Sequence, residues 1–193
     1  MKIMKIKISF FSVLMITSLL LTQKYYALLP LLVAFLHECG HLAAARIKHI
    51  TIKSLDIGIF GARINLDGGV YSYSDEIWVC LGGPLVNLFC ADAAAIIVRL
   101  FDIHSDAMAL FILSSVSLGI INLLPINSFD GGRILFGIIA KKKPLSFAEK
   151  TLKISSFICL FFLWIISVYL LLKTSASISL FVFSLSLFAT IFM

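Results

Sequence analysis

The sequence is poor in charged residues. Asp, Glu, Lys and Arg together make up 13% of its 193 residues, whereas hydrophobic residues make up 61%. The mean hydropathy of +1.07 lies far outside the range of soluble proteins. A long polar segment is also missing, because the longest one, residues 47–76, is too short to fold alone without staples. These absences exclude a soluble regulatory domain and predict one integral membrane domain over residues 1–193.

The sequence also gives no sign of a disulfide framework or of a signal-peptide cleavage site. The four cysteines all fall within apolar runs, so they are interpreted as small core residues and not as a disulfide framework. Lysines precede the first apolar run, as in a signal peptide, but no small-x-small cleavage site follows it. We therefore interpret this run as a retained membrane anchor.

Nucleic-acid binding is not expected, although the net charge is +6. The basic residues gather in segments that alternate with the apolar runs, which is typical of a cytoplasmic N-terminus under the positive-inside rule. The segments expected inside hold thirteen of them, against three outside (Lys24, Arg99 and Lys173). The run 141–143 is most simply a topology determinant, with acidic lipid or a partner as a second interpretation.

Six apolar runs are long enough, or nearly so, to span a bilayer. They cover residues 8–22, 25–45, 77–100, 107–126, 154–172 and 178–193. We therefore predict an all-α polytopic membrane protein with six transmembrane helices. Apolar residues alternate with other residues on both sides of Phe60 and Gly61. This pattern predicts a short cytoplasmic or membrane-associated β-hairpin between the second and third helices. Its edge could bind substrate as an added strand, or the segment could be a plain hairpin.

The second apolar run contains His37-Glu38-Cys39-Gly40-His41. Residues four apart share one helix face, so both histidines can bind one metal ion, and the glutamate between them can act as general base. A chance match would require a polar helix face, which this run lacks. Ionisable groups within a membrane span are costly and are taken as functional by default.

Two histidines need a third protein ligand to form a catalytic zinc site. Arg46 follows His37 by nine residues, so the pair lies about 14 Å from the cytoplasmic end of its helix. His49 and His104 are poorly placed in this topology. Asp130 is better placed, because it follows Pro125 near the inner end of its own span and precedes two glycines. An ordinary interfacial turn is the alternative interpretation of that segment.

Asn87 lies about 15 Å from the inner end of the third span, at the estimated depth of His37. Its amide could bind substrate or an oxyanion, or it could serve as a contact between helices. Asp92 is too far from the inner end to pair with Asp130 as an aspartyl protease would require. We find no account of Asp92 beyond a polar contact within the bundle.

The motifs His37-Glu38-x-x-His41, Gly82-Gly83-Pro84-x-x-Asn87 and Asn122-x-x-Pro125 followed by Asp130-Gly131 occur in this order. Together they resemble the site-2 proteases, which are intramembrane zinc metalloproteases, and most closely the stage IV sporulation protein FB group. The resemblance covers residues 25–133. It implies that His37, His41 and Asp130 bind Zn²⁺ and that Glu38 is the general base.

The function implied is hydrolysis of a peptide bond in or near the membrane segment of a membrane-tethered protein. A sporulation sigma-factor precursor is the substrate that the resemblance suggests, and membrane regulatory proteins are further candidate partners. Glu38 and Asn87 are the predicted catalytic residues, with the active site facing the cytoplasm. A membrane metal transporter using the same His and Asp ligands is the alternative, but it would not require a glutamate base.

Overall fold

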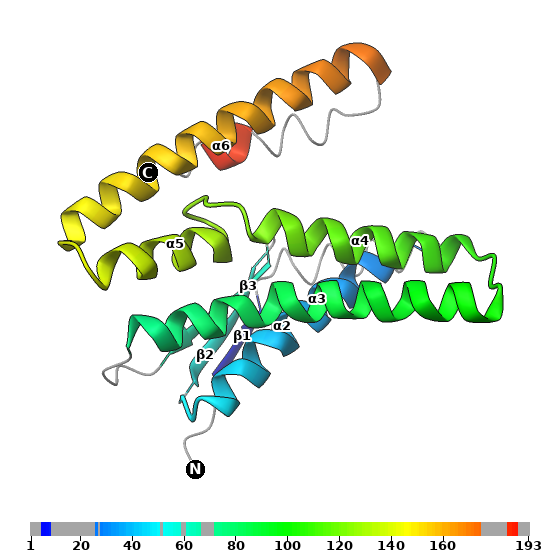
Figure 1. The fold of residues 1–193 in the computed structure, drawn as a ribbon, viewed down its shortest axis with the longest axis horizontal. Helices are drawn as coiled ribbons and strands as arrows, with labels where there is room; N and C mark the ends of the chain where they lie inside the picture. Colours follow the sequence, from blue (N-terminus) through cyan, green and yellow to red (C-terminus); the bar gives the residue numbers. More distant parts are fainter. Residues whose placement is uncertain are drawn as a thin grey trace. The chain divides into compact units, whose positions relative to one another are not determined.

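The computed structural model describes residues 5–8, 26, 28–50, 52–58, 61–66, 72–174 and 185–188 (Figure 1). Its elements, in chain order, are β1 (Lys5–Ile8), α2 (Leu28–Ile47), β2 (Ile52–Gly58), β3 (Gly61–Leu66), α3 (Tyr73–Phe101), α4 (Asp106–Asn122), α5 (Asp130–Ala140) and α6 (Leu145–Thr174). They divide between two compact units, residues 1–121 and residues 122–193, and each unit is described by itself.

Helices α2 and α3 form the centre of the first unit. The Ser72 side chain caps α3 by accepting a hydrogen bond from the Ser74 backbone N–H at 3.2 Å, and such a cap satisfies one of the free N–H groups at a helix start. At the other end, Asp102 adopts the left-handed conformation at φ 51°. The signals at both ends therefore fix the length of α3.

Glycines let α2 and α3 approach within backbone contact. A Cβ atom on Gly40 would collide with the carbonyl oxygen of Gly82, and one on Gly82 would lie 2.8 Å from the Cβ of Ala44. Along α2, His37 pairs with Asn87 and the later His41 pairs with the earlier Val79. The two helices therefore run antiparallel. Small residues permit this kind of close packing where lipid provides no hydrophobic drive between helices.

The strands of the first unit form one three-stranded sheet in the order β1-β2-β3. Strand β1 pairs with β2 in parallel, and β2 pairs with β3 antiparallel, with Leu55 opposite Ile64. A parallel pair joins segments that are far apart in sequence. The sheet therefore ties the start of the chain to the segment between α2 and α3.

In the second unit, helix α6 holds the loop that leads into α5. The Asn127 backbone N–H donates to Ser156 Oγ at 2.9 Å, and Ser155 Oγ donates to the Pro125 carbonyl at 3.0 Å. Ile126 is completely buried and packs in one cluster with Leu160 of α6. The loop is therefore fixed at several points, and so is the start of α5, where Asp130 lies.

The all-α fold with six transmembrane helices is corrected by this structure. Among the described residues, three helices are long and apolar enough to cross a membrane: α2, α3 and the segment 145–173 of α6. The predicted span 107–126 is cut short, because α4 ends at Asn122 with 17 residues, ahead of Pro125, whereas a span needs about 20 residues. The predicted spans 8–22 and 178–193 fall almost entirely outside the described residues.

The prediction of an all-α protein with a short β-hairpin between the second and third helices is corrected too. Strand β2 is paired on both sides, so the strands belong to a sheet that includes the N-terminal segment. Every residue whose side chain the structure describes lies in a helix or a connecting turn. The Phe60 half of the predicted turn lies outside the described residues.

Candidate metal centre

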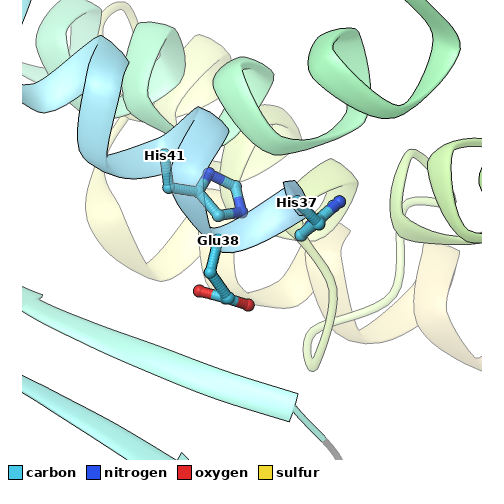
Figure 2. Close-up of side chains that lie close together, drawn as sticks. All are labelled: His37, Glu38 and His41. Carbon is cyan, nitrogen blue, oxygen red and sulfur yellow. The ribbon is translucent and has the colours of Figure 1, made fainter. Parts of the chain in front are cut away.

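His37, Glu38 and His41 form a cluster on α2 (Figure 2). Their possible ligand atoms all lie within 4.8 Å of one another. The two imidazole rings meet edge to face, with centroids 4.7 Å apart and planes at 85°. The helical spacing of four residues brings the histidines to one face, and both are buried, with 5% and 7% of their surface exposed.

The ring of His41 is oriented by the backbone of α3. Its Nδ1 atom lies 2.7 Å from the Val79 carbonyl oxygen, and the Gly83 backbone N–H points at the same atom at 3.3 Å. These two contacts require opposite tautomers of the ring, and the shorter one, to Val79, decides. A carbonyl can only accept a hydrogen bond, so the shorter contact requires a proton on Nδ1. Nε2 of His41 then carries the lone pair that a metal ion needs, and the carbonyl holds the ring in place.

The ring of His37 is held by a side chain of α3. Asn87 Nδ2 lies 3.1 Å from His37 Nδ1, and Asn87 has no exposed surface. Within the part of the chain that the structure describes, Oδ1 of Asn87 has no hydrogen-bond partner. Asn87 was predicted to bind substrate or an oxyanion, or to serve as a contact between helices, and the structure places its amide against His37 of the neighbouring helix.

Gly83 leaves the space that the two rings use. An ideal Cβ atom on this residue would lie 2.5 Å from His41 Nε2 and 2.7 Å from His37 Nε2. The two Nε2 atoms therefore converge beside the backbone of α3, where any side chain would collide with them. Two converging imidazole nitrogens with a neighbouring carboxylate form a donor set that suits Zn²⁺.

Val79, Gly83 and Asn87 follow one another at intervals of four along α3, as His37 and His41 do on α2. Two such rows on antiparallel helices face each other over two turns. The sequence prediction used the glycines only as sites of close approach and did not assign Val79 any role. The matching intervals of four were the signal that could have identified these contacts.

Asp130 is the first residue of α5 and has 9% of its surface exposed. Gly131 and Gly132 follow it, and a Cβ atom on either would collide with backbone carbonyls of the preceding loop, those of Leu123 and Ile126. Glycine at both positions is therefore required for this turn. Asp130 belongs to the second unit, so its place in the ligand set stays a prediction.

Among the described residues, the other sequence candidates are not members of the cluster. His49, in the turn after α2, is exposed with φ 54°. His104 is exposed and lies 3.4 Å from Asp102 at the end of α3. Asp92 is exposed on α3, and Cys39 is half-buried.

Comparison with known proteins gives three findings. A family model described as peptidase family M50 matches residues 99–166, a stretch that includes Asp130 but not the histidine pair. Stage IV sporulation protein FB of Bacillus subtilis (strain 168) is 34% identical over 144 residues, which are 73% of this chain and 50% of that protein. Zinc metalloprotease MJ0392 of Methanocaldococcus jannaschii is 31% identical over 55% of this chain and 32% of its own length.

A solved structure is also similar. The site-2 protease from Methanocaldococcus jannaschii matches with a TM-score of 0.63 and 25% identity, covering 99% of this chain and 91% of that chain. The present chain thus spans half the length of the sporulation protein and about a third of that of the zinc metalloprotease.

Proposed function

We propose, from its membership of peptidase family M50, the site-2 protease family, that this chain is an intramembrane zinc metalloprotease. The resemblance predicted from the three motifs is thereby confirmed. The observation that carries the proposal is the His37-Glu38-His41 cluster, with both histidines buried, on a helix long and apolar enough to span a membrane. Ionisable side chains are rarely placed at such depth without a function.

In the proposed mechanism, Nε2 of His37 and Nε2 of His41 would hold the metal ion, with Asp130 as the third protein ligand. Zinc, when bound, supplies a Lewis acid that lowers the pKa of water to about 7 and polarises a carbonyl group. Support for Asp130 comes from its burial, from the fixed turn that it begins, and from the need of catalytic zinc sites for three protein ligands.

Glu38 is the proposed general base. It lies between the two histidines and within the cluster, so its carboxylate can accept a proton from the attacking water. The same carboxyl group can then deliver that proton to the leaving amine nitrogen when the peptide bond breaks. Asn87 belongs to the proposed catalytic site through its contact with His37.

The proposed substrate is a membrane-tethered protein, cleaved in or near its membrane segment. A tethered precursor that acts in sporulation is the more specific proposal, since one relative is named as a sporulation protein. The bias of lysine and arginine toward the ends of the second and fourth apolar runs supports a site that opens to the cytoplasm.

The test of the function replaces Glu38 by Gln. This change keeps the size of the side chain but removes the base, so we expect full zinc content and loss of cleavage of a membrane-tethered reporter. Cleavage by this variant would refute the mechanism. Zinc transport into vesicles by a wild-type protein that cleaves nothing would instead favour the transporter.

Sidedness has its own test, based on Cys39, which is half-buried next to Glu38. In a variant whose other three cysteines are replaced, an impermeant charged thiol reagent should label Cys39 from the cytoplasmic face only. Labelling from the outer face alone would overturn the proposed orientation.

A further inference from the structure

We infer that Asn87 is a positioning residue for the metal centre: its side-chain carbonyl fixes the tautomer of His37 that can bind zinc. The inference rests on the proposed function, since it takes His37 as a ligand. It starts from a mismatch between the hydrogen bond seen at His37 and the one that ligation requires.

Helix α3 orients the two histidines by different groups. At His41 the orienting group is a backbone carbonyl, Val79 O, at 2.7 Å from Nδ1. A carbonyl accepts the Nδ1 proton and leaves Nε2 deprotonated, which is the ligand form. At His37 the group 3.1 Å from Nδ1 is the amide nitrogen of Asn87, which can only donate.

Donation from Asn87 to Nδ1 selects the opposite tautomer of His37. A neutral imidazole that accepts at Nδ1 carries its proton on Nε2, and Nε2 is the atom that converges with that of His41 beside Gly83. In this amide orientation His37 is therefore not ready to bind a metal ion through Nε2.

A half turn of the Asn87 amide resolves the mismatch. The oxygen and nitrogen ends of the amide have nearly the same shape, so the turn places Oδ1 against Nδ1 without moving either helix. In the structure as it stands, Oδ1 of Asn87 has no hydrogen-bond partner among the described residues. After the turn, Oδ1 accepts the Nδ1 proton. His37 then has the same arrangement as His41.

The burial of Asn87 makes this contact specific. The side chain has no exposed surface, so water is not available to replace it at Nδ1. Loss of the amide would remove the group that lies against His37 Nδ1, and outer partners of this kind change metal affinity by about 10- to 100-fold.

The test measures zinc affinity of purified full-length protein by competition with a chelator. Asn87→Leu removes the acceptor at similar size and should weaken zinc binding by about 10- to 100-fold. Asn87→Asp keeps an acceptor oxygen and should restore wild-type affinity. The matched control is Ser115→Ala, because Ser115 is also completely buried in the same unit and should leave affinity unchanged.

The outcomes separate this inference from the proposed function. Wild-type protein that binds no zinc would refute the metal centre itself. Wild-type binding with equal affinity in the Leu variant would refute only the role of Asn87. If the variants do not fold, nitrogen NMR of the zinc-loaded wild-type protein decides: a protonated Nδ1 on His37 supports the inference, and a deprotonated or metal-bound Nδ1 overturns it.

Discussion

Replacement of Gly83 by alanine tests the geometry of the metal centre directly. The added methyl group would lie 2.5 Å from His41 Nε2 and 2.7 Å from His37 Nε2. Non-bonded atoms of this size settle at about 3.5 Å. Both rings would therefore have to retreat by about 0.8–1 Å, or the two helices would have to separate.

A displacement of this size is large for a metal site, where ligand distances hold to within about 0.2 Å. We therefore expect zinc affinity to fall by about 100-fold or more, and proteolysis to fall with it, because a misplacement of about 1 Å can cost roughly 100-fold in rate. The free energy of unfolding should fall much less than the free energy of zinc binding. Alanine is favoured over glycine in a helix interior by about 1 kcal/mol, which opposes the loss.

The assay is a chelator competition on purified protein, together with thermal unfolding of the same samples. Gly119→Ala is the matched control, because its new methyl group would come no closer than 3.2 Å to the Leu88 side chain and 3.3 Å to the Pro84 carbonyl oxygen, and neither belongs to the metal centre. Zinc affinity in Gly83→Ala equal to that of the wild type would refute the convergence of the two Nε2 atoms beside this glycine.

Three further predictions follow from the same contacts. Gly82→Leu should separate α2 from α3, because even a Cβ atom there would lie 2.5 Å from the Gly40 carbonyl; unfolding temperature should drop well below that of Gly119→Ala, and an unchanged value would contradict the packing. Asp130→Ala should lower zinc content as measured by metal analysis, and full occupancy would remove Asp130 from the ligand set. Ser156→Ala should cost about 1 kcal/mol of stability by leaving the Asn127 N–H without its acceptor, measured by denaturant unfolding; no change would mean that this hydrogen bond is replaced.

The sequence alone predicted most of the metal centre that lies on one helix. His37, Glu38 and His41 share a helix, and the period of a helix places residues four apart together whatever the rest of the chain does. The depth estimate also placed Asn87 level with His37, because rise per residue is constant along a helix. These predictions depend only on local geometry.

The number of spans was not predictable in the same way. Hydropathy showed a continuous apolar run over 107–126, but α4 ends at Asn122. The loop that follows it is stabilised by Ser155 and Ser156 of α6. A hydropathy average over neighbouring residues carries no information on such distant contacts. The pairing of β1 with β2 was missed because it joins distant segments.

Only the tertiary structure decided what surrounds the two histidines. Sequence could propose Asn87 for an oxyanion, but the direction of its amide depends on how α2 and α3 face each other. That geometry follows from the close approach at Gly40 and Gly82. Once the two backbones touch, the face of α3 opposite the histidines presents Val79, Gly83 and Asn87 at successive turns, and each of them contacts a histidine ring.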